Sequence, residues 1–169
     1  MKPQSNVMRL GLSRGWIEFK LQILSPQGVF AAVFAPALCL VFLWIFNARQ
    51  IEIEGVPFAH FLLASFLGVQ VTQEGLMGVA NKLALDREDG TLLRAKAMPH
   101  GNSSYLIARV VVTVLSAFLG LTLLLVPGAF IVRDLVFIDG AGLVTVAWVL
   151  ALGLLATAPI GAVIGALVK

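Results

Sequence analysis

Four long apolar segments set the strongest limit on what this sequence can fold into. They run over about 29–46, 61–80, 105–132 and 143–168. A helix of about 20 residues crosses the hydrocarbon core of a bilayer, so each segment is long enough to span it. Lipid offers an open backbone no hydrogen-bond partners, and four segments cannot close a β-barrel. The sequence therefore predicts an all-α membrane protein, a bundle of four transmembrane helices.

The composition excludes a soluble domain. Apolar residues make up 59% of the chain and charged residues only 12%, whereas soluble domains carry about a quarter charged residues. The net charge is +3, but the sequence has no run of basic residues and no basic residues interleaved with aromatic ones. Because proteins that bind nucleic acids usually have such patterns, we expect no nucleic-acid partner. The partner that this composition requires is a lipid bilayer.

The distribution of Lys and Arg predicts the orientation of the helices. One topology places the N-terminus, the 81–104 loop and the C-terminus inside, together with Lys2, Arg9, Arg14, Lys20, Lys82, Arg87, Arg94, Lys96, Arg109 and Lys169. The other side then keeps only Arg49 and Arg133. Under the positive-inside rule, this bias predicts a multi-pass protein of the cell membrane with a cytoplasmic N-terminus.

Residues 1–28, before the first apolar segment, have the periodicity of an amphipathic helix. Its apolar residues are Leu12, Trp16, Phe19 and Ile23, with Ile17, Leu21 and Leu24 beside them, and its polar face carries Arg14, Glu18 and Gln22. We expect this helix to lie in the inner membrane interface and to end near Ser25-Pro26. The alternative is that it packs on the other helices.

The loop 81–104, between the second and third segments, is the least generic part of the chain. The second helix is expected to continue to about Asp89, where Gly90 takes the left-handed conformation that ends a helix. Thr91 then caps a short helix that Pro99 stops. The candidate residues of this corner are Asp86, Arg87, Glu88, Asp89, Gly90, Thr91, Leu92, Arg94, Lys96 and Pro99. From residue types alone, a docking element for a soluble partner and a solvated loop remain equally open.

The stretch from Asp86 to Pro99 resembles the signature of ABC-2 type transporter permeases, including the daunorubicin-export type. In that family a Glu-x-Gly-Thr-Leu stretch, followed by a proline, lies on the cytoplasmic loop after the second span. The matching residues here are Glu88, Gly90, Thr91, Leu92 and Pro99. The family usually has six spans, so this chain corresponds to the first four, either as the N-terminal part of a permease or as a shortened one. The helix over 1–28 also resembles the connecting helix of the family.

The resemblance implies the membrane subunit of an ATP-driven exporter of drugs, lipids or polysaccharides, as in multidrug efflux. The loop would couple to a separate ATPase subunit that binds ATP and Mg²⁺, and a second permease subunit, identical or related, would complete the transporter. The chain itself has no Gly-x-x-x-x-Gly-Lys-Ser/Thr phosphate loop, so we expect it to bind no cofactor. A non-transporting membrane scaffold is the alternative function.

Neither a catalytic site nor a metal site is expected. The sequence has no His-Glu-x-x-His or Gly-x-Ser-x-Gly motif, which argues against a membrane protease or hydrolase. The two histidines, His60 and His100, fall on opposite sides of the membrane in the expected topology, and Cys39 is the only cysteine. The sequence therefore favours a transport protein over an enzyme.

Polar side chains inside the second segment mark a candidate site. Gln70, Gln73 and Glu74 are expected to share one helix face, which lines a translocation path or contacts a second subunit. The equal alternative is that Glu74 lies near the inner interface and pairs with Lys82 or Arg109. Arg109 itself is expected to reach the inner headgroups.

Small residues at four-residue spacing in the third and fourth segments allow close helix approach. The pairs are Ser116 with Gly120 and Gly161 with Gly165. We expect them to serve contacts within the bundle rather than a dedicated dimer seam.

Overall fold

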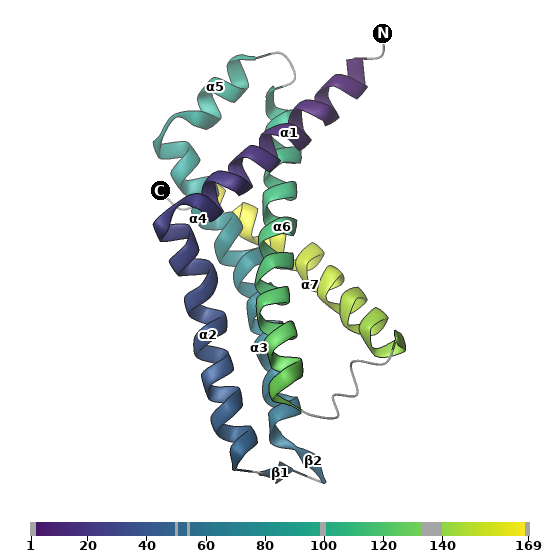
Figure 1. Cartoon of the computed structure of the whole chain (residues 1–169). Helices are drawn as coiled ribbons and strands as arrows, with labels where there is room; N and C mark the ends of the chain where they lie inside the picture. Colours follow the sequence, from purple (N-terminus) through teal and green to yellow (C-terminus); the bar gives the residue numbers. More distant parts are fainter. Residues whose placement is uncertain (1–2, 50, 54, 99–100, 133–139, 168–169) are drawn as a thin grey trace.

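The computed structural model describes residues 3–49, 51–53, 55–98, 101–132 and 140–167. The described chain is almost wholly helical (Figure 1), with α1 (Pro3–Leu24), α2 (Pro26–Ala48), α3 (Phe58–Thr72), the π-helical turn η1 (Gln73–Gly78), α4 (Val79–Glu88), α5 (Thr91–Ala97), α6 (Gly101–Ile131) and α7 (Gly140–Leu167). A small antiparallel hairpin of β1 (Glu52–Ile53) and β2 (Val56–Pro57) joins α2 to α3. The all-α fold expected from the sequence is confirmed.

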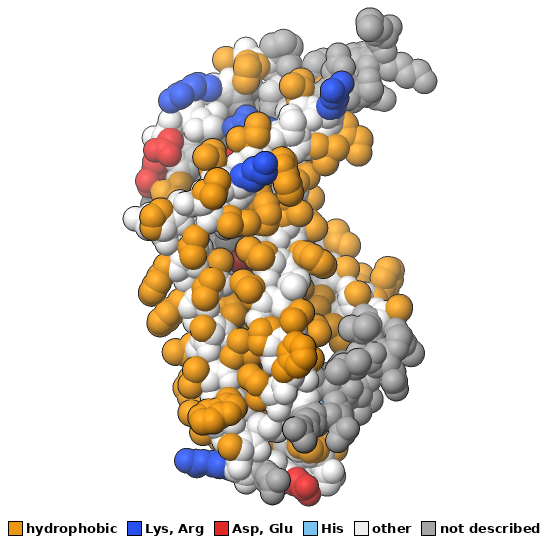
Figure 2. Space-filling model, in the orientation of Figure 1, with side chains coloured by type: hydrophobic (Ala, Val, Ile, Leu, Met, Phe, Trp, Pro, Cys, Tyr) orange, Lys and Arg blue, Asp and Glu red, His pale blue; other side chains and the backbone are white. Residues whose placement is uncertain are grey.

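Among the described residues, three helices are long and apolar enough to cross a bilayer. They are Pro26–Ala48, Gly101–Ile131 and, within α7, Val144–Leu167. On the face shown in Figure 2, hydrophobic side chains cover the middle of the molecule, and charged side chains lie toward its two ends. Because a soluble protein rarely exposes such a large apolar surface, the chain is a membrane-embedded protein.

The second apolar segment does not form one regular helix of spanning length. α3 has 15 residues, fewer than the about 20 that cross a bilayer. The chain then passes through η1 into α4 with right-handed helical backbone angles at each junction. A π turn is a local bulge in a helix and is often found at functional sites. The predicted count of four spans therefore stays a prediction.

A tight break at Ser25 separates α1 from α2. The Ser25 hydroxyl accepts a hydrogen bond from the Gly28 N–H at 3.0 Å and donates one to the Gln22 carbonyl at 2.8 Å. Pro26 occupies the first turn of α2, where its missing N–H removes no helical hydrogen bond. The predicted end of the first helix near Ser25-Pro26 is confirmed.

Replacing Ser25 by alanine is expected to destabilise the protein by about 1 kcal/mol, because α2 loses its N-terminal cap. The measurement is SDS-induced unfolding of the purified protein in mild detergent, followed by circular dichroism. Ser13→Ala is the control, since the exposed Ser13 hydroxyl bonds only to the Leu10 carbonyl of its own helix, at 3.0 Å. Equal effects of the two substitutions would contradict the capping role.

α1 packs lengthwise on the N-terminal half of α6. An added Cβ at Gly11 would lie 2.6 Å from Ile107, and one at Gly15 would lie 2.9 Å from Val111, so only glycine permits this approach. The exposed large apolar side chains of α1 are Met8, Leu10, Leu12, Trp16, Ile17, Leu21 and Leu24. The face of α1 that carries its polar residues thus packs on other helices, as the alternative to an interfacial helix requires. That the outward face of α1 lies in the membrane interface stays a prediction.

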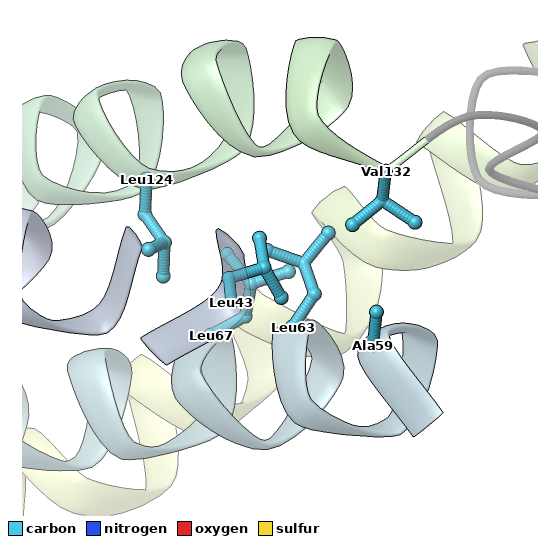
Figure 3. Close-up of a cluster of buried hydrophobic side chains, with 6 residues drawn as sticks. All are labelled: Leu43, Ala59, Leu63, Leu67, Leu124 and Val132. Atoms are coloured by element: carbon cyan, nitrogen blue, oxygen red, sulfur yellow. The ribbon is translucent and has the colours of Figure 1, made fainter. Parts of the chain in front are cut away.

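The core of the bundle lies between α2, α3 and α6, toward the hairpin end (Figure 3). Its buried side chains are Leu43, Ala59, Leu63, Leu67, Leu124 and Val132. At the same end, the Asn47 side-chain amide donates a hydrogen bond to the Ile131 carbonyl at 2.9 Å and joins the ends of α2 and α6. Toward the opposite end, Val79, Ala108 and Val112 are also buried, and polar contacts add to their packing.

Glycines bring α7 against η1 and α4. An added Cβ at Gly161 would lie 2.5 Å from the carbonyl oxygens of Gly75 and Leu76. An added Cβ at Gly165 would lie 2.7 Å from the Ala80 carbonyl oxygen. These residues form the glycine seam of α7, and the expectation that they serve contacts within the bundle is confirmed.

Candidate functional site

The predicted corner after the second segment is an elbow between α4 and α5. The Asp89 N–H donates to the Leu85 carbonyl at 2.9 Å, and the Gly90 N–H donates to the Arg87 carbonyl at 3.2 Å. Gly90 then adopts φ +68°, which residues with a Cβ rarely adopt. The helix end, the left-handed glycine and the short helix that follows are therefore as the sequence predicts. Thr91 differs, because it is the first residue of α5 rather than a cap before it.

α5 lies at the end of the molecule opposite the hairpin (Figure 1). Two apolar side chains are exposed there: Leu93 is 69% exposed, and Met98, just after the helix, is 55% exposed. The predicted corner residues Glu88, Asp89 and Arg94 are exposed as well. Leu92 and Lys96 lie on α5, and Pro99 lies outside the described residues. The elbow thus presents apolar and charged side chains together on one short helix.

A buried polar cluster attaches α4 to α6 directly below the elbow. The Asp86 carboxylate accepts a hydrogen bond from the Tyr105 hydroxyl at 2.6 Å and forms an ion pair with the Arg109 guanidinium. Arg109 also donates to the Tyr105 hydroxyl at 3.3 Å. The Arg109 side chain is 11% exposed and that of Asp86 23%, so solvent screens the pair only weakly.

This cluster corrects one prediction and adds a residue that the sequence reasoning missed. Arg109 does not reach out to headgroups, because its guanidinium turns inward to Asp86. Tyr105, whose aromatic ring at the start of the third segment is typical of a membrane interface, is 4% exposed and bonded to the same carboxylate. The available signal was its spacing of four residues from Arg109, which puts both on one helix face. The Arg14 guanidinium lies 5.6 Å from the Tyr105 ring centroid and brings α1 to the cluster.

Arg87 ties the elbow to the C-terminal end of α7. Its guanidinium donates hydrogen bonds to the carbonyl oxygens of Gly165 at 3.3 Å and Ala166 at 2.7 Å. The last carbonyls of a helix lack partners within the helix and carry partial negative charge, so a cation is favourable there. Arg87 is thus a second attachment of α4, to α7.

Lys82 ties α4 to α1 and to the middle of α6. Its ammonium donates to the Gln22 side-chain oxygen at 2.5 Å, and the Gln22 amide donates to the Ser116 hydroxyl at 3.4 Å. Among the described residues, Glu74 forms an ion pair with neither Lys82 nor Arg109, which is the pairing that the alternative interpretation of Glu74 predicts.

The three candidate residues of the second segment, Gln70, Gln73 and Glu74, do not share one face as predicted. Gln70 and Glu74 line a cavity of about 80 Å³ with Gln22 and Ser116, between α1, α2 and α6. Gln73 is exposed and faces a different, open surface of α3 and η1. A cavity of this size that is lined by polar groups is large enough to hold water. Gln70 and Glu74 are thus the pair that faces inward.

No family model, no curated protein and no solved structure matches this chain.

Proposed function

We propose that this chain is the membrane-spanning permease subunit of an ATP-driven exporter, and that the elbow carries movement from an ATPase subunit into the membrane. The observation that supports this most directly is the combination of an exposed α5 with a firmly attached α4. Leu93 and Met98 are open to a partner, whereas Asp86 lies in a buried cluster a few residues away. A soluble partner that grips α5 therefore acts on the bundle itself.

The contacts of α4 give the route by which such a movement would spread. Asp86 connects α4 to α6, Arg87 connects it to α7, and Lys82 connects it to α1 through Gln22. Hydrogen bonds to charged groups are worth about 1.5–3 kcal/mol each, stronger than neutral ones. A shift of α5 would move these helices together rather than deform a loose loop.

In this proposal the chain has four spans, and the second of them is α3 continued by η1 and the first turn of α4. The N-terminus and the elbow face the cytoplasm, and the protein resides in the cell membrane. A second permease subunit completes the transporter, the ATPase subunit supplies ATP and Mg²⁺, and the cargo is a drug, lipid or polysaccharide. The four apolar segments support the number of spans, and the distribution of Lys and Arg supports the orientation. The resemblance of the Glu88–Pro99 stretch to ABC-2 permeases supports the partner subunits and the cargo.

A membrane scaffold without an ATPase is the alternative function. It would use the same exposed helix to bind a soluble protein, so the fold alone does not separate the two. The discriminating property is the identity of the partner, because only the exporter requires a nucleotide-hydrolysing subunit.

Replacing Leu93 by aspartate is expected to abolish co-purification of an ATPase, since the exposed Leu93 side chain would no longer enter an apolar pocket of the partner. The measurement is a pull-down of the tagged full chain from its native membranes in mild detergent, with ATP hydrolysis assayed in the eluate. Val56→Asp is the matched control, because Val56 is also exposed but lies on the hairpin at the opposite end.

The outcomes of this experiment separate the proposals. Recovery of an ATPase with the native chain and with Val56→Asp, but not with Leu93→Asp, supports coupling through α5. Recovery of a partner without ATPase activity would favour the scaffold. Equal recovery of the ATPase with both variants would place the contact elsewhere and refute the role of α5.

A further inference from the structure

An open groove of about 510 Å³ runs along the outer face of α3 and η1. It is lined by Ser65, Gly68, Val69, Thr72, Gln73, Leu76 and Met77. Gly68 contributes no side chain to this groove, and an added Cβ there would meet no described atom within 4 Å. No contact within the described chain therefore requires a glycine at this position.

Gln73, in the wall of this groove, lies deep in the membrane. The side chain of Gln70, about one helical turn before it, packs on Gly120, since an added Cβ at Gly120 would clash with its amide. Gly120 is near the middle of the spanning helix Gly101–Ile131. A helix rises 1.5 Å per residue and the hydrocarbon core is about 30 Å thick, so Gln73 lies about 10 Å from the nearer edge of the core. A glutamine side chain does not reach that far.

The chemistry of the Gln73 amide excludes lipid as its neighbour. This side chain is exposed, and it has no hydrogen-bond partner among the described residues. Lipid tails offer neither donors nor acceptors, so hydrocarbon over the groove would leave both ends of the amide unsatisfied. Polar side chains at membrane depth therefore face protein or water.

The rest of the groove favours protein over water. The exposed apolar side chains of Val69 and Met77 lie one turn before and one turn after Gln73 on the same helix face. The Ser65 and Thr72 hydroxyls donate to carbonyls of their own helix at 2.8 Å and 2.9 Å. A water-filled path needs polar groups along its length. A single amide between small and apolar side chains is instead typical of a contact between membrane helices.

A second copy of the chain supplies the partner that the Gln73 amide lacks. Copies in one membrane share one orientation, so the two-fold axis that relates two of them runs along the membrane normal and puts Gln73 of both at the same depth. A carboxamide has two donor hydrogens and an acceptor oxygen, so two such groups exchange two hydrogen bonds across the axis. The absence of a side chain at Gly68 allows the two helices to approach closely.

We propose that the face of α3 and η1 that carries this groove binds the same face of a second copy, with the two Gln73 amides paired at the centre. The second copy is the second permease subunit of the proposed function, on which its role in transport rests. The contact itself requires only the membrane-embedded chain. Because it consists of one groove and one amide pair, we expect it in the bilayer and not in dilute detergent.

Disulfide cross-linking of the full chain in phosphatidylcholine vesicles tests where the copies meet. Val69→Cys is made in a Cys39→Ala background, because Cys39 is the only cysteine of the chain. Oxidation is expected to join two copies through position 69, and the dimer is detected on a non-reducing gel. Thr122→Cys in the same background is the control and should stay monomeric, since Thr122 is exposed on α6 outside the groove wall.

The affinity of the two copies tests the amide pair. Förster transfer between chains labelled at the N-terminus with a donor or an acceptor gives the dimer fraction as added lipid dilutes the protein. Gln73→Leu is expected to weaken association about tenfold, because two hydrogen bonds between the helices are lost. Gly68→Leu, which has no clash within the chain, is expected to weaken association at least as much. Thr122→Leu should leave it unchanged.

Three results would overturn the proposal. Equal cross-linking of Val69→Cys and Thr122→Cys would show only random collision. Absence of a cross-link with Val69→Cys would assign the groove to another neighbour. Association unchanged by Gln73→Leu would remove the amide pair from the contact. The exporter stands or falls separately, because the purified chain is tested here without an ATPase.

Discussion

Gly161→Leu is expected to separate α7 from η1 and α4 and to destabilise the protein by about 3 kcal/mol, the upper part of the range for overpacked cores. An added Cβ at this position would lie 2.5 Å from two carbonyl oxygens, those of Gly75 and Leu76. Both belong to helix backbone, which cannot rotate away as a flexible side chain could. The remaining leucine atoms would need space in the same contact, so relief requires a shift of the whole helix.

SDS-induced unfolding in mild detergent measures this effect, and Gly68→Leu is its matched control. Gly68 is also a helical glycine, on α3, but an added Cβ there meets no described atom within 4 Å. That substitution removes the flexibility of glycine without a clash, so it should be neutral or stabilise the helix by up to about 1 kcal/mol. A loss of stability for Gly68→Leu as large as that for Gly161→Leu would refute the glycine seam of α7.

The features that the sequence predicted correctly are those set by neighbouring residues. Long apolar segments define three spanning helices because length and hydropathy are local properties. The break at Ser25-Pro26 and the left-handed Gly90 follow from the geometry of proline, a capping hydroxyl and glycine. Each of these could be predicted without knowing which helices touch.

The contacts at the elbow depended on which helices meet and could not be read from spacing. Arg109 was expected to reach headgroups, since a lone cation near a helix end usually does, and nothing in the sequence places Asp86 beside it. A second difference lies in the second segment, where Gln73 lies apart from the face that Gln70 and Glu74 share. Consecutive residues of a helix point about 100° apart, so Gln73 and Glu74 face one cavity together only if it is wide. Which of the two faces inward depends on the neighbouring helices and cannot be read from spacing.

Asp86→Ala is expected to destabilise the protein by about 3 kcal/mol, because it leaves the buried Arg109 charge without its counter-ion. The Tyr105 hydroxyl loses its acceptor in the same step. Asp86→Asn keeps an oxygen for Tyr105 but removes the charge, so its cost should be intermediate. SDS-induced unfolding of the purified chain gives the order of the three proteins.

Asp89→Ala serves as the control, since Asp89 lies on the same elbow with an exposed side chain, and its loss should change stability by less than about 0.5 kcal/mol. The double variant Asp86→Ala/Arg109→Met removes the counter-ion and the charge together. Its cost should therefore be smaller than the sum of the two single costs, because no unpaired charge remains. Additive costs would show that Asp86 and Arg109 act independently, and the elbow would then not be attached to α6 through this ion pair. A coupled result, by contrast, identifies the ion pair as the contact through which a movement of α5 would reach the third apolar segment.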